Sequence, residues 1–227
     1  MAREPTGAPI HLRPHADVAE RVLAPGDPGR ALRLAQVLLD QPLMLNHNRG
    51  LWGYTGAAAD GAPLTIQSTG LGGPSAAIVT HELIALGARR IVRVGTCGVL
   101  GGALALGALV AADPVLARDG TSRALGASER LAPDPALLDV LRDRATATGP
   151  VASTDLFYAA PGHRARAGAL AYELEAAAVL AVCAAAGVAA ACVLLVVADA
   201  AGGRLDVDAV HTGELQLGRA GAAAFGL

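Results

Sequence analysis

The stretch Ala176–Ala198, AAAVLAVCAAAGVAAACVLLVVA, decides the fold class because it contains no charged residue and is divided near its middle by Gly187. An uncharged run of this length is also compatible with a membrane span. However, the run is mostly alanine, it follows directly on Glu175, and no basic flank marks a cytoplasmic side. We therefore interpret it as a buried helix over Ala176–Ala186, a glycine break and a central strand over Ala190–Val197.

The rest of the chain shows the same alternation of apolar strands and helices, without a linker, repeat or low-complexity tail. This alternation predicts a single α/β domain over residues 1–227, with a central mixed, largely parallel β-sheet covered by helices on both faces. The other predicted strands are Arg21–Ala24, Leu51–Ala57, Leu64–Ser68, Ile91–Val94, Leu109–Ala112 and Leu170–Leu174. The other predicted helices are Pro28–Leu39, Pro74–Leu86, Pro135–Thr146 and Val207–Ala224.

Composition excludes several classes of protein. Hydrophobic residues make up 53% of the 227 residues, which excludes disorder, and a net charge of −2 offers no general attraction for nucleic acid or an anionic membrane. All 18 basic residues are arginine, so a Schiff-base lysine, a pyridoxal phosphate anchor and a Walker A lysine are excluded. The three cysteines and the histidines show no metal-ligand spacing, so we expect no metal site. The start of the chain lacks a signal peptide, and we expect a cytoplasmic protein.

Arginines stand next to glycine-containing turns at three places that follow apolar runs. These are GDPGR at Gly26–Arg30, NRG at Asn48–Gly50 and RVGTCG at Arg93–Gly98. Each places a planar, permanently charged guanidinium beside backbone that a ligand can approach closely. Ligands of such sheets gather at the carboxyl ends of strands, and Arg30, Arg93 and Asp199 all fall just beyond such ends. The pattern favours one oxyanion, with phosphate as the first candidate, held from several sides.

Other candidate residues each have a structural and a functional interpretation. Glu173 and Glu175, two apart at a strand end, are either solvated or placed to bind ribose hydroxyls. Asp199 follows the last buried strand, where it either caps the next element or donates a proton with a raised pKa. Gly26–Arg30 is either a plain strand–helix joint or a loop whose amides and helix N-terminus face an anion. Phe157 is either core or a flat face for a heterocycle.

Taken together, these segments resemble the nucleoside phosphorylase family, which includes bacterial hexameric purine nucleoside phosphorylases, archaeal-type methylthioadenosine phosphorylases and uridine phosphorylases. The resemblance runs from about Ile10 to Phe225, and the order and spacing of its motifs make it specific. It implies a nucleoside phosphorylase-like fold, with inorganic phosphate as co-substrate and no metal or other cofactor. The motifs are VLAPGDPGR at 22–30, NRGLWGYTG at 48–56, GGPS at 72–75, RVGTCG at 93–98 and ELEAA at 173–177.

The resemblance also implies roles at the matching positions. His11 for the sugar and Arg49 for the phosphate would be lent by a neighbouring subunit, so it implies an obligate homo-oligomer, commonly a dimer-based hexamer. The residues implied for phosphate are Gly26, Arg30, Arg93 and Thr96, together with the neighbour's Arg49. Those implied for ribose are Glu173, Leu174 and Glu175, together with the neighbour's His11. Those implied for the base are Cys97, Gly98, Phe157 and Asp199, of which Asp199 is also the catalytic acid.

The implied reaction is phosphorolysis of purine (deoxy)ribonucleosides. Phosphate attacks the anomeric carbon of an oxocarbenium-like sugar, while Asp199 protonates the leaving base. The sequence departs from the family at several points. Leu174 replaces the usual methionine of a Glu-Met-Glu motif, a change that nearly conserves volume. The segment 148–150 looks shortened, and the arginine that often pairs with the acid has two candidates, Arg204 and Arg219.

Other functions remain open. Uridine phosphorylase is the nearest alternative, although 161–166 only approximates the glutamine and arginine clamp with which that branch reads uracil. A nucleosidase would use water and would have no need for three arginines. A non-catalytic nucleotide-binding module would tolerate the loss of Asp199. A nicotinamide-dependent oxidoreductase is only weakly supported, because Pro74 interrupts the glycine spacing that begins at Gly70.

Overall fold

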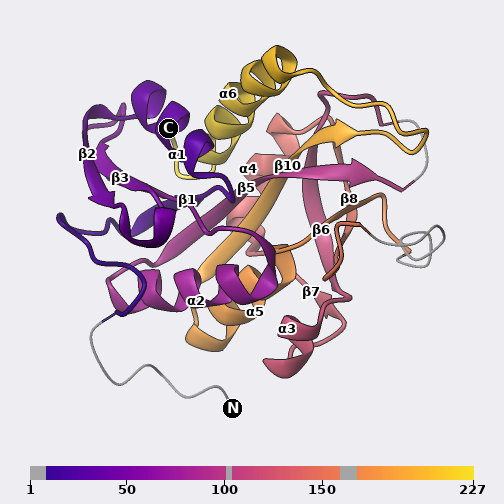
Figure 1. The fold of residues 1–227 in the computed structure, drawn as a ribbon, viewed down its shortest axis with the longest axis horizontal. Coiled ribbons are helices and arrows are strands. Elements are labelled where there is room, and N and C mark those ends of the chain that lie inside the picture. Colours follow the sequence, from indigo (N-terminus) through magenta and orange to yellow (C-terminus); the bar gives the residue numbers. More distant parts are fainter. Residues whose placement is uncertain (1–8, 101–103, 159–167) are drawn as a thin grey trace.

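The computed structural model describes residues 9–100, 104–158 and 168–227, and the strands in these ranges form one sheet (Figure 1). They are β1 Arg21–Ala24, β2 Asp40–Asn46, β3 Gly53–Ala57, β4 Pro63–Gln67, β5 Arg90–Val99, β6 Leu109–Ala117, β7 Arg130–Leu131, β8 Ala147–Ser153, β9 Ala171–Glu173 and β10 Ala189–Ala198. The strands β5, β10, β6, β8 and β9 pair in a closed ring, because β5 is bonded to both β9 and β10. From β5 the sheet continues through β1, β4 and β3 to β2.

The sheet is mixed, as predicted. Its centre is parallel, with β1 between β4 and β5 and with β5 beside β10 over almost its whole length. The edge formed by β4, β3 and β2 is antiparallel. Half of all the pairings are parallel and half are antiparallel, so parallel pairing dominates the centre of the sheet and not the whole of it.

The helices cover both faces of the sheet, as predicted. They are α1 Pro28–Leu38, α2 Gly72–Ala85, α3 Gly120–Ala124, α4 Pro135–Arg144, α5 Ala176–Ala186 and α6 Val207–Ala223, with a short 3₁₀ turn, η1, at Asn48–Gly50. Helices α2, α3 and α5 pack together on one face, and α1, α4 and α6 on the other (Figure 1). Each layer encloses its own apolar core, with Leu83 and Val179 in one and Leu34 and Leu217 in the other.

The segment that decides the fold class forms the elements expected of it. Helix α5 is buried over Ala176–Cys183, and it ends at Gly187, whose φ of 66° lies in the left-handed region that glycine adopts without strain. Strand β10 follows immediately and is buried over most of its length. In the parts of the chain that the structure describes, every helix is too short or too polar to cross a membrane.

One local prediction needs correction, and two of the strands are absent from the prediction. The strand predicted to end at Val94 continues as β5 to Val99, so the expected Gly95–Gly98 loop is strand. Glycine is needed at position 98 because the Tyr172 ring packs closely against the backbone there, and a Cβ would lie 2.6 Å from that ring. The sequence does not predict strands β2 and β8, because each contains a proline and β8 also contains a glycine, residues that strands usually lack. The segment 148–150, which looks shortened in the sequence, lies inside β8.

Candidate active site

A cavity of about 150 Å³ lies where β1, β5, β9 and β10 approach their carboxyl ends, beside the first turns of α1 and α5. Most of the predicted site residues line it, from all three of the predicted subsites. They are Gly26, Arg30, Arg93, Thr96, Cys97, Gly98, Phe157, Glu173, Leu174 and Glu175. The remaining wall comes from Asp27, Leu71, Tyr172, Val197, Ala198 and Arg204. The predicted convergence is therefore found for Arg30 and Arg93, whereas Asp199 is not among the lining residues.

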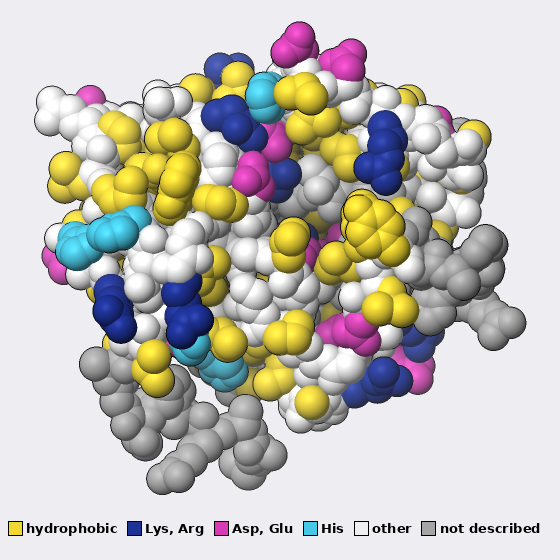
Figure 2. Space-filling model, viewed as in Figure 1, with side chains coloured by type: hydrophobic (Ala, Val, Ile, Leu, Met, Phe, Trp, Pro, Cys, Tyr) yellow, Lys and Arg dark blue, Asp and Glu magenta, His cyan; other side chains and the backbone are white. Residues whose placement is uncertain are grey.

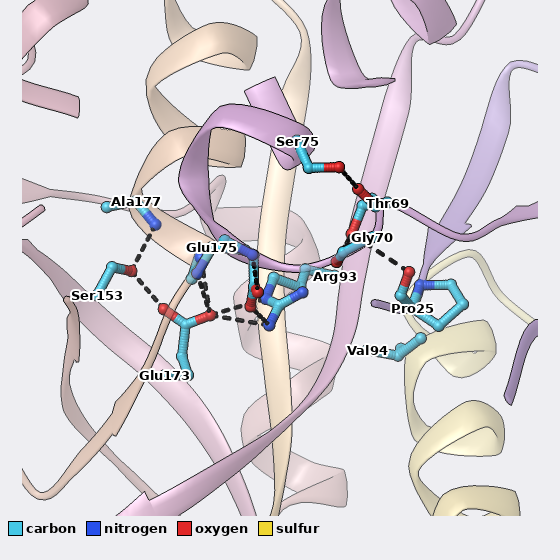
Figure 3. A network of polar contacts seen from close by, with 12 residues as sticks. Pro25, Thr69, Gly70, Ser75, Arg93, Val94, Ser153, Glu173, Glu175 and Ala177 are labelled. Carbon is cyan, nitrogen blue, oxygen red and sulfur yellow. Dashed lines mark hydrogen bonds and ion pairs between the residues drawn. The ribbon is translucent and has the colours of Figure 1, made fainter. Parts of the chain in front are cut away.

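Arg93 on β5 is the charged centre of the cavity, and only 2% of it is exposed. Its Nε donates a hydrogen bond to Glu173 Oε2 at 2.9 Å, and its Nη2 donates to Glu175 Oε2 at 2.5 Å. The backbone amides of Glu175 and Ala176 also donate to Glu173 Oε2, at 2.8 and 2.9 Å. The Ser153 hydroxyl donates to the other Glu173 oxygen (Figure 3). Glu173 is thus fully engaged with protein groups and fixes the Arg93 guanidinium.

Glu175 is held less completely than Glu173. Its Oε1 accepts a hydrogen bond of 2.6 Å from the amide of Gly72, and its Oε2 is the oxygen that meets Arg93. Gly72 begins α2, so this bond ties the start of that helix to the cavity wall. A carboxylate has about four acceptor positions, and the two bonds to Glu175 leave the others for hydroxyl groups of a ligand.

Burial and charge shift the ionisation of this cluster. Burial raises the pKa of the Glu173 carboxyl, and the Arg93 guanidinium only partly opposes the shift. Burial by itself would lower the pKa of Arg93, but the carboxylates of Glu175 and Glu173 raise it above its ordinary value, so the guanidinium stays charged. Burial also raises the pKa of the Cys97 thiol to about 12, which makes it a neutral wall residue at physiological pH.

One nitrogen of Arg93 has no protein partner. Its Nη1 is buried, and among the described residues no group accepts a hydrogen bond from it. Buried polar atoms are nearly always paired, and leaving one unpaired costs about 1–3 kcal/mol. Arg93 as a residue lines the cavity, so its guanidinium still has donor capacity beside the space that a ligand would fill.

Arg30, near the start of α1, is the second arginine of the cavity and is 6% exposed. Its Nε donates to Glu214 Oε1 at 2.8 Å, and its Nη1 donates to the carbonyl oxygen of Val94 at 3.3 Å. The amides of Gly29 and Arg30, expected to face an anion, donate instead to the Asp27 carboxylate at 3.0 and 2.9 Å. Asp27 caps α1, so those two amides are already engaged, and the Arg30 side chain is the cationic group of this loop that lines the cavity.

The base end of the cavity is more open. Phe157 is 42% exposed, and the guanidinium carbon of Arg204 lies 5.9 Å from the centroid of its ring. Arg204 therefore borders the cavity, whereas Arg219, the other candidate partner of the acid, lies in a different surface hollow with Arg144. The predicted uracil-type clamp at 161–166, with Arg164 and Arg166, lies outside the described residues.

Asp199 does not line the cavity, although its neighbours Val197 and Ala198 do. Its Oδ1 accepts hydrogen bonds from the amides of Ala201 and Gly203 at 2.9 and 2.8 Å. The half-buried carboxylate therefore closes the turn that follows β10, in agreement with the structural interpretation of this residue.

His11 and Arg49 also lie outside the cavity, but they lie next to one another. The Asn48 side chain donates to the carbonyl oxygen of His11 at 2.8 Å, which joins the two segments. Arg49 is exposed, in a left-handed conformation with a φ of 58°. The His11 ring is oriented by Glu82, whose Oε1 lies 2.8 Å from Nδ1.

The surface near these two residues is apolar. Leu43 and Met44 on β2 are 60% and 42% exposed, and Trp52 is 38% exposed. Figure 2 shows hydrophobic side chains gathered at the upper left of the molecule, where Figure 1 places β2 and β3. Within the described ranges, no group of three or more His, Cys, Asp or Glu side chains is arranged to hold a metal ion.

The fold and the site define an α/β protein in which Arg30, Arg93 and two buried glutamates line one cavity. The sequence profile of the phosphorylase superfamily matches residues 20–225, and the chain belongs to this superfamily. The predicted resemblance, and with it the prediction of a pentosyltransferase, is confirmed.

Individual relatives carry different substrate names. The chain is 36% identical over 193 residues to a guanosine phosphorylase of Halorubrum lacusprofundi, which covers 80% of this chain and 77% of the relative. It is 34% identical over 193 residues to a DeoD-type purine nucleoside phosphorylase of Clostridium beijerinckii, covering 79% and 81%. The crystal structure of a uridine phosphorylase from Vibrio fischeri superimposes with a TM-score of 0.82 at 27% identity, covering 92% and 91%.

Proposed function

We propose that this protein cleaves the N-glycosidic bond of purine (deoxy)ribonucleosides with inorganic phosphate, giving the free base and (deoxy)ribose 1-phosphate. The observation that carries the proposal is that Arg93, Arg30 and Glu175 line one cavity, and that Arg93 Nη1 has no hydrogen-bond acceptor among the described residues. A guanidinium that lacks one acceptor suits an oxyanion, and the adjacent carboxylate suits the hydroxyls of a sugar.

The proposed chemistry follows from this arrangement. Arg93 and Arg30, together with Thr96, hold phosphate in line with the anomeric carbon, so attack does not wait for a chance collision. Glu175 accepts hydrogen bonds from the ribose hydroxyls, and Leu174 packs beneath the sugar. The positive charge that develops on the sugar in the transition state is stabilised by the phosphate and the nearby carboxylates. The base stacks on Phe157 beside Cys97 and Gly98.

Asp199 is proposed as the acid that protonates the departing purine. Its Oδ1 is held by the turn that follows β10, so Oδ2 is the oxygen available for proton transfer. For this role the 199–203 turn has to carry Oδ2 toward the base when substrate binds. A neutral base leaves more easily than an anionic one, and a positioned acid contributes about 10²–10⁴-fold.

The cavity is proposed to be completed by a second copy of the chain. His11 and Arg49 lie on the same part of the surface, outside their own cavity and next to the exposed apolar side chains of β2. That surface suits an interface through which one subunit lends His11 to the sugar and Arg49 to the phosphate of its neighbour. A dimer-based hexamer is the expected assembly, and sedimentation analysis of the purified protein measures it.

Base release from inosine, guanosine, adenosine and methylthioadenosine, measured with and without phosphate, tests the proposal. We expect release that requires phosphate, with sugar 1-phosphate as the second product. Release that proceeds equally well without phosphate would identify a nucleosidase. If no panel member turns over and phosphate still binds, a non-catalytic binding module is favoured.

Uridine phosphorolysis is the second candidate, and the close superposition on a uridine phosphorylase favours it. The same assay separates the two functions when uridine is included. We expect purine nucleosides to be cleaved faster, because Asp199 provides an acid that a purine leaving group can use. Equal or faster cleavage of uridine would overturn the purine assignment while leaving phosphorolysis intact.

A further inference from the structure

Glu214 is a buried acid that none of the assigned roles explains. It lies on α6, its side chain is 2% exposed, and its carboxylate faces α1. Oε1 accepts the 2.8 Å hydrogen bond from Arg30 Nε, whereas Oε2 accepts from Arg33 Nε at 2.9 Å and from Arg33 Nη2 at 2.5 Å. The approach of the two helices is close, since Gly218 on α6 leaves no room for a Cβ against Leu34 on α1.

The two arginines that share this carboxylate differ in position. Arg30 lines the cavity, and its side chain is 7% exposed. Arg33 does not line it, is 30% exposed, and also reaches the Asp27 carboxylate at 3.3 Å. With Asp27 included, the two guanidinium groups and the two carboxylates of this cluster have no net formal charge, so Arg30 offers the cavity hydrogen-bond donors in a fixed direction and not an excess of charge.

The contacts of Arg30 fix the direction of its guanidinium. Glu214 on α6 accepts the Nε hydrogen, and the carbonyl oxygen of Val94 on β5 accepts one Nη1 hydrogen, so two different elements hold the side chain. An arginine has five N–H donors, so three remain for other acceptors. A free arginine side chain loses rotamer entropy when a ligand orders it, and an arginine already held by its neighbours avoids most of that loss.

We propose that Glu214 is a positioning residue that holds the Arg30 guanidinium in the direction required for phosphate. The proposal rests on the function proposed above. It predicts that changes at Glu214 weaken phosphate binding and leave nucleoside binding nearly unchanged, because Glu173 and Glu175 belong to a separate network around Arg93.

Three substitutions test this proposal in the full-length protein. Glu214→Leu removes the acceptor and should raise the KM for phosphate about tenfold, with less than about a twofold change in the KM for the nucleoside. Glu214→Asp keeps the charge but is one methylene shorter, and should raise the phosphate KM about threefold to fivefold. Glu214→Gln retains an acceptor for Arg30 Nε and should stay within about threefold of the wild type.

Arg33→Ala is the matched control, since it removes the other partner of the same carboxylate outside the cavity. We expect it to change the phosphate KM by less than about twofold. Calorimetric titration of each variant with inorganic phosphate gives a second measurement that does not depend on turnover. Thermal unfolding identifies a variant that does not fold, and Glu214→Asp then carries the test.

The outcomes are distinct. A phosphate KM and affinity unchanged in folded Glu214→Leu or Glu214→Asp would overturn the positioning role. Equal increases in both KM values, or an effect of Arg33→Ala as large as that of Glu214→Leu, would point to a structural role and also overturn it. Failure of the proposed function looks different, because wild-type base release would then ignore phosphate whatever residue stands at 214.

Discussion

At the end of the cavity proposed to bind phosphate and ribose, Arg93 and Glu173 are 2% and 4% exposed and are joined by hydrogen bonds from three strands and a helix start. At the base end, Phe157 is 42% exposed, and the turn that holds Asp199 closes on itself and not on the cavity. The first end is rigid and its chemistry is set before a substrate arrives. The second depends on side chains that can move.

This contrast explains why the superfamily is clear and the substrate is not. In the proposed function, the densely hydrogen-bonded groups bind what all the candidate substrates share, a phosphate and a pentose. The base is contacted by the exposed end, where small changes in a turn alter the fit. The relatives accordingly include proteins named for guanosine, for purine nucleosides and for uridine at comparable similarity.

Arg93→Leu would break the rigid end and should have the largest effect. The substitution leaves Glu173 and Glu175 buried without their cation, which costs about 3–5 kcal/mol of unfolding free energy. It should also lower kcat/KM by about 10³-fold, because it removes the proposed phosphate donor. Chemical denaturation and phosphate-dependent base release measure the two effects. Arg123→Leu, an exposed arginine on α3, is the control and should stay within about 0.5 kcal/mol of the wild type.

A mild effect of Arg93→Leu on stability would mean that the two glutamates are neutral in the fold and do not need the arginine. That result would remove the distinction between a rigid, charge-paired end and an open end.

Asp199→Asn probes the open end without disturbing the fold. Asparagine retains an oxygen that can accept from the amides of Ala201 and Gly203, so the turn should persist. If Asp199 is the acid, kcat for purine nucleosides should fall by about 10²–10⁴-fold while the KM for phosphate stays nearly constant. Intact purine turnover would show that Asp199 only caps the turn, which is the contact present in the structure.

Features that depend on residues close together in the sequence could be predicted, and features that depend on contacts between distant residues could not. Strand β10 and helix α5 are set by local apolar pattern, and the sequence predicts them within about a residue. The arginine–glycine turns identify Arg30 and Arg93 because a ligand site needs both charge and close backbone. Their carboxylate partners could not be predicted in the same way, since Glu214 pairs with Arg30 from 184 positions away and one glutamate among many carries no local signal.

Glu173 shows the same limit, because the sequence identifies it as a site residue but does not predict its hydrogen-bond partners. Its position beside Glu175 in the sequence predicts a ribose ligand. The structure shows that protein groups already engage both of its oxygens, which suits it to fix Arg93. The sequence offers Arg204 only as a partner for the acid, and its position over Phe157 depends on the turn at 199–203, which no pattern specifies.

Arg204→Ala should weaken the base end selectively. The loss of one cation–π contact and its donors is expected to raise the KM for the nucleoside about fivefold, equivalent to about 1 kcal/mol. The KM for phosphate and the unfolding free energy should change little, because Arg204 is exposed. Arg219→Ala is the control for the other candidate partner and should leave both KM values unchanged. A nucleoside KM that responds to Arg219→Ala and not to Arg204→Ala would reverse this assignment.

The pH dependence of the unfolding free energy tests how the buried Glu173 carboxyl differs from the exposed groups at the other end of the cavity. Burial raises the pKa of Glu173 in the fold, so its contribution to stability is fully present below its ordinary pKa of 4.5 and is lost as pH rises through the raised value. Glu173→Gln cannot ionise, and its unfolding free energy relative to the wild type should therefore rise as the pH increases above 4.5, until the pH passes the raised pKa of Glu173 in the fold. The rise should be about 1.4 kcal/mol for every pH unit that separates the folded pKa from the unfolded one. Denaturation curves of both proteins across this range measure the difference, in which groups common to both cancel. A difference that stays constant with pH would mean that the Arg93 charge compensates the carboxylate fully, and that ionisation at the rigid end costs the fold nothing.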